Sequence, residues 1–221
     1  MEQTPANTPA ICLIFGGGDI ENDDAICREA DSAAMILCAD SGYEHCVRLG
    51  LVPHLLMGDF DSIRIDAPPT IPRITLSPDK DYTDTSFAVE EALSRGFRHI
   101  VLAGMLGGRL DHTLANLQTL AYLSRRGVNA RITDGVTTVF AFTAPLQGRA
   151  FPLTRREKHY FSLLAASEVC TNIHIDGGKY PLNGYQLRFD EPRAVCNEFL
   201  ATDVTIRMDS GTLLVTTTPI R

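Results

Sequence analysis

The sequence predicts an α/β protein: a doubly wound, mostly parallel sheet followed by an all-β sandwich. Short apolar runs alternate with amphipathic helical stretches as far as residue 134, which is typical of a parallel sheet. After about residue 135 the helical periodicity disappears and short β-rich runs follow one another closely. The chain has 221 residues, enough for two such units. We therefore expect an α/β domain over residues 10–134 and a β-sandwich domain over residues 135–221.

Continuous apolar runs mark the strands of the first unit. Residues 10–15 end at three glycines, and residues 35–39 end at Asp40. Both runs are apolar throughout, which is typical of strands buried on both faces. The other strands expected in this unit are 54–57, 73–76 and 99–103.

Apolar residues at helical spacing mark the helices between these strands. In 83–95, Ala88 and Ala92 lie four residues apart on one face, and Gly96 follows the last turn. The stretch 111–126 has the same spacing and ends just before a glycine. Two shorter helices are expected over 22–30 and 43–49.

The second unit reads as β-strands joined by short turns. Asp209-Ser210-Gly211, which separates the last two runs, predicts a hairpin. The runs expected as strands are 137–143, 159–164, 169–175, 185–189, 203–208 and 212–217.

Composition excludes several partners. The formal net charge of −7 argues against nucleic acid held through its phosphates. The six cysteines form no C-x-x-C pair, which predicts free thiols and a reducing compartment. The sequence shows no basic and apolar leader, and no run reaches the ~18 apolar residues of a membrane span. We expect a cytoplasmic protein that binds neither nucleic acid nor a membrane.

Acidic residues follow the predicted strands at the point where each strand ends. Ligands of an open parallel sheet bind outside the carboxyl ends of its strands, so these acids are expected on one rim. Two unit charges about 4 Å apart repel by roughly 4 kcal/mol at an effective dielectric near 20, so acids that converge indicate a bound cation. Carboxylates suit Mg²⁺, which takes one or two of them with water and substrate phosphates. The acids are Asp40, Asp59, Asp61, Asp81, Asp84 and Asp111.

The loop 104–112 has the composition of a phosphate site. Gly107 and Gly108 allow the backbone to approach an anion, and the helix start that follows offers free N–H groups. Arg109 can bind phosphate through two parallel hydrogen bonds. The alternative is a tight strand–helix turn with an exposed arginine, in which Asp111 and His112 only cap the helix.

Other common motifs are missing from the sequence. Gly16-Gly17-Gly18 is followed by Glu21 where a dinucleotide fingerprint has its third glycine, and no G-x-x-x-x-G-K-[ST] occurs. The histidines lack the H-E-x-x-H spacing of zinc hydrolases, and no G-x-S-x-G is present.

Taken in order, four segments resemble the motif set of the thiamine pyrophosphokinases. They are 39–42 (ADSG), 58–62 (GDFDS), 79–84 (DKDYTD) and 107–112 (GGRLDH). Two later segments, 178–182 (GKYPL) and 196–198 (CNE), are similar to the family's G-x-K-[WY]-x-L and S-N-E motifs. The resemblance extends over roughly residues 11–217.

The resemblance implies an ATP-dependent diphosphotransferase, a thiamine diphosphokinase. Such an enzyme moves the diphosphoryl group of ATP to the hydroxyl group of thiamine and yields thiamine diphosphate and AMP. The resemblance also implies Mg²⁺ and a homodimer with shared active sites.

The same resemblance implies roles for individual residues. Asp59, Asp61 and Asp84 would hold Mg²⁺. The transfer itself requires a carboxylate that accepts the proton of the thiamine hydroxyl, and for this role we expect Asp81 or Asp111. The ATP site would include Asp40, Lys80, Thr83, Gly107, Gly108, Arg109 and His112. The thiamine site would include Tyr180, Cys196 and Asn197.

Two residues depart from the family pattern. Ser41 replaces the commoner glycine, and Cys196 replaces a serine, although a thiol is the poorer hydrogen-bond donor. Two other classes of function also fit the acids. A Mg²⁺-dependent nucleotide phosphohydrolase would use them to activate water, and a nucleotide-sensing module would bind without catalysis.

Overall fold

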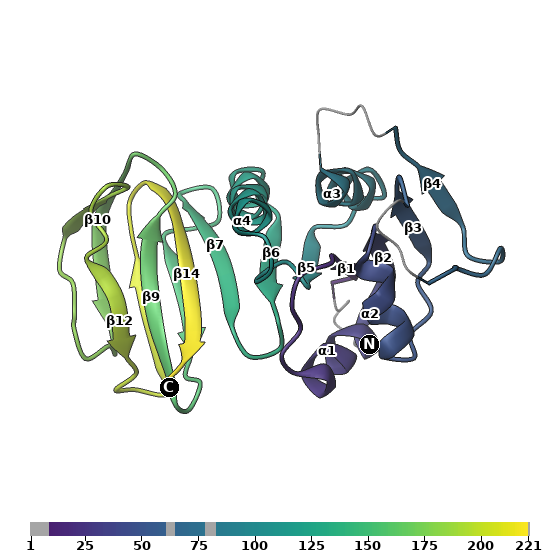
Figure 1. Ribbon diagram of the computed structural model, residues 1–221. Coiled ribbons are helices and arrows are strands. Elements are labelled where there is room, and N and C mark those ends of the chain that lie inside the picture. Colours follow the sequence, from purple (N-terminus) through teal and green to yellow (C-terminus); the bar gives the residue numbers. More distant parts are fainter. Residues whose placement is uncertain (1–8, 61–64, 78–82, 221) are drawn as a thin grey trace, which may run out of the picture.

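The computed structural model describes residues 9–60, 65–77 and 83–220. Six parallel strands form the first half of its main sheet. They are β1 (Ile11–Phe15), β2 (Ala33–Ala39), β3 (Leu55–Gly58), β4 (Arg73–Thr75), β5 (His99–Ala103) and β6 (Asn129–Thr133). Four antiparallel strands continue the same sheet: β7 (Thr138–Ala144), β9 (His159–Ala165), β12 (Ala194–Glu198) and β14 (Gly211–Pro219). The order is β12-β9-β14-β7-β6-β5-β1-β2-β3-β4, so one sheet runs the length of the molecule (Figure 1).

A second sheet of four strands covers one face of the antiparallel half. Its order is β11-β10-β13-β8, formed by β8 (Ala150–Thr154), β10 (Val169–Asp176), β11 (Tyr185–Arg188) and β13 (Asp203–Arg207). Phe142, Phe161 and Val215 of the main sheet pack with Ile173 and Ile206 of the small sheet in a single core. The predicted fold class, a parallel α/β sheet followed by a β-sandwich, is confirmed.

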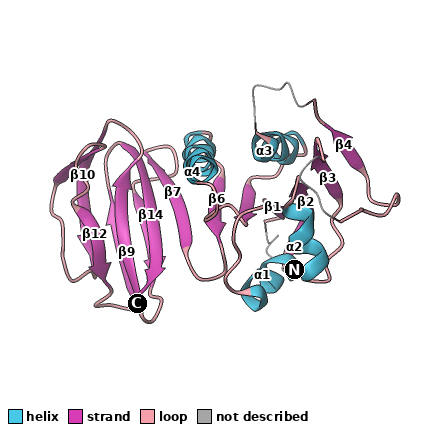
Figure 2. Ribbon diagram, viewed as in Figure 1, coloured by secondary structure: helices cyan, strands magenta, loops and turns pink. Residues whose placement is uncertain are grey.

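Helices cover both faces of the parallel half (Figure 2). They are α1 (Asp23–Asp31), α2 (Gly42–Arg48), α3 (Asp84–Ser94) and α4 (Leu110–Arg125). Side chains of a strand point alternately to its two faces. Leu13 and Phe15 of β1 therefore pack on the side of α1 and α2, whereas Cys12 and Ile14 pack on the side of α3 and α4.

Local sequence signals explain where the helices begin and end. Asn22 Oδ1 accepts from the Ala25 N–H at 3.0 Å before α1, and Thr83 Oγ1 accepts from the Ser86 N–H at 3.2 Å before α3. Gly96 and Gly127, which follow α3 and α4, adopt positive φ angles of 88° and 72°. All four helices begin and end within one residue of the predicted positions.

The predicted strands are all present, but three further strands and one turn differ from expectation. The sequence analysis did not predict β6, β8 or β12. The predicted hairpin at Asp209-Ser210-Gly211 is wrong, because β13 and β14 belong to different sheets. Ser210 instead pairs with Thr171 of β10, and the chain crosses between the two sheets at Gly211.

The two halves of the main sheet are joined without a break. After β6 the chain turns at Asp134, whose Oδ1 accepts from the N–H groups of Val136 and Thr137 at 2.7 and 2.6 Å. β7 then pairs antiparallel with β6. The predicted division between residues 134 and 135 falls in this turn. No helix of the described residues is long and apolar enough to cross a membrane.

Candidate active site

The direction of winding changes at β1. β2, β3 and β4 follow on one side of it, and β5 and β6 lie on the other. Loops that leave two adjacent strands in opposite directions open a crevice at such a point, and ligands of α/β proteins bind there. The loops in question are 16–19 after β1 and 104–109 after β5.

These two loops are bonded to each other. The N–H of Gly16 donates to Ala103 O at 2.8 Å, that of Gly18 to Gly104 O at 2.7 Å, and that of Asp19 to Leu106 O at 2.7 Å. Gly107 has a φ of +76°, and a Cβ there would lie 1.8 Å from Asp19 Oδ2. The loops therefore form one glycine-rich surface.

The sequence analysis set aside the loop 16–19 because Glu21 stands where a dinucleotide-binding fingerprint has its third glycine. The structure nevertheless places it beside the predicted phosphate loop. Three consecutive glycines directly after a buried strand were the signal that could have identified it.

Helix α2 supports this surface from one side. A Cβ at Gly17 would lie 2.0 Å from Ser41 Oγ, so the serine occupies the space that this glycine leaves. His45 Nε2 donates to Gly18 O at 2.8 Å. Burial lowers the pKa of His45, which favours the neutral ring that this hydrogen bond uses. Ser41 and His45 thus contact the glycine loop, and the sequence analysis did not anticipate these contacts.

Predicted acids stand at neighbouring strand ends beside this surface. Asp40 follows β2 with a φ of +47°, and its N–H donates to Met57 O at 2.7 Å. A Cβ at Gly58 would lie 3.3 Å from Asp40 Oδ1, and Asp59 comes next in the chain. Asp84 is the first residue of α3, which packs against β1, β2 and β3.

Three predicted site residues lie outside the described residues: Asp61, Lys80 and Asp81. Within residues 9–60, 65–77 and 83–220, no three histidine, cysteine or acidic side chains are close enough to form a metal site. The acids that are described still suit Mg²⁺, because this ion is commonly held by one or two carboxylates and by substrate phosphates.

Arg109 and Asp111 form an exposed two-pronged ion pair at the start of α4. Arg109 Nε and Nη2 donate to the two carboxylate oxygens of Asp111 at 3.1 and 2.6 Å. The hydrogen bond from Arg109 lowers the pKa of Asp111 to about 2. His112 contributes its backbone N–H to Asp111 Oδ1 at 3.0 Å. Asp111 is therefore a weak proton acceptor as long as it keeps this partner.

Two residues of α4 hold the phosphate loop in place. Thr113 Oγ1 donates to Gly107 O at 3.1 Å, and the buried Asn116 donates from Nδ2 to Met105 O at 2.9 Å. Gly108, with a φ of +59°, has open space where a Cβ would be. Nothing in the motif indicated Thr113 or Asn116, because their role depends on the path of the loop.

The predicted thiamine residues lie together, far from the acids. Tyr180 N donates to Asn197 Oδ1 at 2.9 Å, and Cys196 is exposed on β12. β12 is one edge of the main sheet, whereas β3 and β4 lie at the other end (Figure 1). One chain therefore does not bring Tyr180 to the acidic rim.

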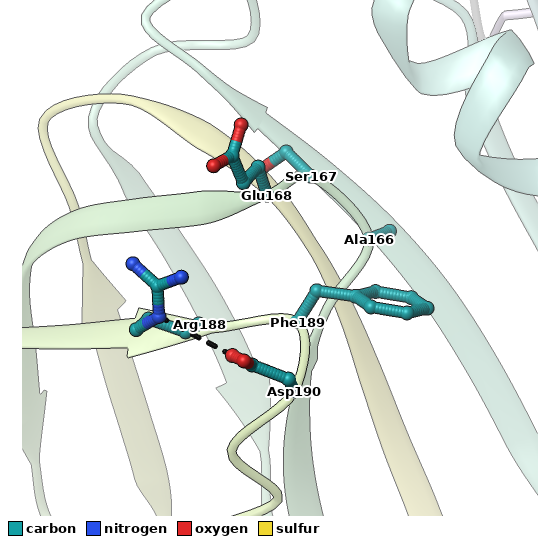
Figure 3. A pocket seen from close by; sticks show the side chains of 6 residues that line it. All are labelled: Ala166, Ser167, Glu168, Arg188, Phe189 and Asp190. Atoms are coloured by element: carbon teal, nitrogen blue, oxygen red, sulfur yellow. Dashed lines mark hydrogen bonds and ion pairs between the residues drawn. The ribbon is translucent and has the colours of Figure 1, made fainter.

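Two hollows share Ala166 and Phe189; the larger lies where α3 and α4 face the β-rich half, and the smaller lies within the β-rich half. The larger, of about 1230 Å³, is a mostly apolar groove lined by Phe87, Leu114, Leu117, Phe189 and Leu214 among others. The smaller, of about 390 Å³, contains Glu168 and the Arg188–Asp190 ion pair, and the ring of Phe189 projects from it beside Ala166 (Figure 3). Within the described parts of the chain, neither hollow is lined by a predicted site residue.

Comparison with known proteins gives two family matches in order along the chain. Residues 26–132 match "Thiamin pyrophosphokinase, catalytic domain", and residues 150–213 match "Thiamin pyrophosphokinase, vitamin B1 binding domain". The thiamine pyrophosphokinase of Bacillus subtilis (strain 168) is 28% identical over 193 residues, which is 84% of this chain and 87% of the relative.

Two further comparisons agree. Thiamin pyrophosphokinase 1 of Caenorhabditis elegans is 28% identical over 174 residues, or 72% of this chain and 68% of the relative. The crystal structure of thiamine pyrophosphokinase from B. subtilis has a TM-score of 0.83 with 24% identity, and the match covers 95% of this chain and 99% of the other. That structural match shows a shared fold.

Proposed function

The chain belongs to the thiamin pyrophosphokinase family, as its motifs predicted, and we propose that it transfers the diphosphoryl group of ATP to the hydroxyl group of thiamine. The products are thiamine diphosphate and AMP. The observation that carries the proposal is that two glycine loops are bonded to each other at the point where the sheet changes its winding, with Asp40 and Asp59 following the neighbouring strands β2 and β3.

The glycine surface is the site for the ATP phosphates. Gly108 has open space where a Cβ would be, so the backbone there is accessible to an anion. The N-terminus of α4 follows at once, and its N-cap residue Arg109 makes no side-chain capping bond. Arg109 is exposed and can exchange the Asp111 carboxylate for phosphate oxygens with the same two-pronged geometry.

Asp59, Asp61 and Asp84 are the residues that would hold Mg²⁺. The ion supplies charge that neutralises the triphosphate when it is bound. Asp40, Lys80, Thr83 and His112 complete the proposed nucleotide site. The six free cysteines fit a reducing, cytoplasmic compartment.

The proposed transfer needs a group that accepts the proton of the thiamine hydroxyl. The thiamine oxygen bonds to the β-phosphorus, the bond from this phosphorus to the oxygen bridging to the α-phosphorus breaks, and AMP departs with that oxygen. The hydroxyl proton passes to Asp81 or Asp111. If Arg109 turns to the phosphates, the pKa of Asp111 rises toward its usual range, and its carboxylate becomes a better acceptor.

Product analysis tests the reaction. With ATP and Mg²⁺ we expect AMP and thiamine diphosphate in equal amounts, formed only when thiamine is present. Release of phosphate without thiamine would instead indicate a nucleotide phosphohydrolase, and binding without any product would indicate a sensing module. Asp59→Asn should abolish transfer while the protein stays folded, which its thermal unfolding transition would show.

The distance between Tyr180 and the acids supports a homodimer with shared sites. Tyr180, Cys196 and Asn197 of one subunit would then cover the acidic rim of its partner. Mixing Asp59→Asn with Tyr180→Arg, which places a cation where cationic thiamine binds, tests this arrangement. Each mixed dimer should regain one working site. If activity stays absent although subunit exchange is verified, thiamine is bound within a single chain.

A further inference from the structure

The backbone of Tyr180 is held by a single side chain. Asn197 Oδ1 accepts a hydrogen bond from the Tyr180 N–H at 2.9 Å, and Asn197 Nδ2 donates to the Tyr180 carbonyl oxygen at 2.8 Å. Oδ1 also accepts from the N–H of Glu198 at 2.9 Å. The carboxamide thus offers a donor and an acceptor side by side, as a peptide group of a neighbouring strand would.

The surrounding chain is built to bring this carboxamide inward. Cys196 adopts a φ of +58°, and the pairing of β12 with β9 shifts register between Ala194 and Asn197. Asn197 is consequently only 4% exposed, whereas the neighbouring Cys196 faces solvent. A Cβ at Gly178 would lie 3.0 Å from Asn197 Nδ2, so this glycine provides the space that the carboxamide fills.

The ring of Tyr180 is exposed although its backbone is fixed. Tyr180 is 56% exposed, so its ring is accessible to a ligand. Pro181 follows and has no N–H to donate. Lys179 Nζ lies 5.5 Å from the ring centroid and is itself held by Glu198 at 2.6 Å.

We propose that Asn197 is a positioning residue for thiamine: its carboxamide fixes the backbone of Tyr180 so that the exposed ring is ready to stack on thiamine. The inference rests on the proposed function. It replaces the direct contact between Asn197 and thiamine that the motif suggested, because the carboxamide already binds Tyr180 and Glu198. A ring fixed before binding loses less conformational freedom when the ligand stacks on it.

A double-mutant cycle on the full-length protein tests the proposal. Thiamine affinity is measured by calorimetry for wild type, Asn197→Ala, Tyr180→Ala and the double variant. Each single change should weaken thiamine binding roughly three- to tenfold, the size of a lost stacking contact. The double variant should bind no worse than Tyr180→Ala, and ATP affinity should stay unchanged in all four. Asn172→Ala, an exposed asparagine on β10, is the matched control and should behave as wild type.

Several results would overturn the proposal. Additive losses would mean that Asn197 acts on thiamine independently of Tyr180. Unchanged thiamine affinity in Asn197→Ala would remove its role, and an equal loss of ATP affinity would indicate a general folding defect. If Asn197→Ala does not fold, Asn197→Asp replaces it in the cycle, because aspartate keeps the acceptor for the Tyr180 N–H and replaces the donor to Tyr180 O by a charged oxygen.

A measurement without substrate separates this inference from the proposed function. Hydrogen exchange of the Tyr180 amide should be faster in Asn197→Ala than in wild type, because its acceptor is lost. Unchanged exchange would overturn the positioning role even if the enzyme makes thiamine diphosphate. A wild-type protein that makes no thiamine diphosphate would refute the proposed function, whereas the exchange result would still report on Asn197.

Discussion

Gly42→Ala tests whether close contact between α2 and β1 supports the nucleotide surface. Gly42 is the first residue of α2, and a Cβ there would lie 2.2 Å from Phe15 O and 2.5 Å from Phe15 C. Both atoms belong to the backbone of the strand that leads into the loop 16–19. Since no side chain can rotate away, the helix or the strand end must move.

The size of the effect follows from two opposing contributions. Forcing an extra carbon into a packed interior costs about 1–3 kcal/mol, and a backbone clash belongs at the upper end. Alanine is a better helix former than glycine by roughly 0.5–1 kcal/mol, which offsets part of the cost. A net loss of about 2 kcal/mol in the free energy of unfolding corresponds to roughly 4–8 °C in melting temperature for a protein of this size.

Gly50→Ala is the matched control. Gly50 has a φ of +69°, but a Cβ there meets nothing within 4 Å, so the substitution costs about 1 kcal/mol through backbone strain alone. Thermal denaturation and calorimetric ATP binding should show a larger loss of stability for Gly42→Ala than for Gly50→Ala, and weaker ATP binding for Gly42→Ala only. Equal melting temperatures with wild-type ATP affinity in both would refute the reasoning.

Three other predictions concern single groups of the proposed sites. Arg109→Lys should weaken ATP binding about tenfold and change the melting temperature only slightly, because lysine keeps the charge and loses the planar two-pronged geometry; wild-type affinity and turnover would make Arg109 a surface residue only. Arg109 lowers the pKa of Asp111 from 3.8 to about 2, so the pair stabilises the fold above pH 4 and loses this effect as the pH falls toward 2. In urea denaturation the advantage of wild type over Asp111→Asn should therefore vanish between pH 4 and pH 2, and an advantage that persists at pH 2 would contradict the assignment. Alkylation of Cys196, the one exposed cysteine among the six, should be slowed by thiamine and unaffected by ATP alone; mass spectrometry of the modified peptide measures this, and equal rates would place the thiol outside the thiamine site.

Much of the fold could be predicted because apolar periodicity determines it. The run before Asp40 and the helical spacing after Thr83 each gave an element close to its observed bounds. The strands that were missed carry few such signals. β8 contains Pro152, which is tolerated at its edge position, and β6 has Arg131 in its centre, paired with Glu29 of α1 at 2.6 Å.

The candidate site was predictable where it depends on the ends of strands. Asp40 and Asp59 lie at neighbouring strand ends, where the sequence placed them, because a parallel sheet collects its loops at one edge. The positioning of Tyr180 was not visible in the sequence. It depends on a register shift in β12 that directs Asn197 inward, and such a shift is determined by the strands on either side rather than by the residue itself.

The unbroken sheet also limits how this protein can move. Many enzymes exclude water from the reaction by closing two domains about a flexible connection. Here β6 and β7 are hydrogen-bonded neighbours, so bending between the halves would break a ladder of backbone hydrogen bonds. The distance between the acidic rim and Tyr180, which lies beside the edge strand β12, is therefore kept constant. Shielding of the reacting phosphates from water must come from loops or from another subunit, and not from a hinge within the chain.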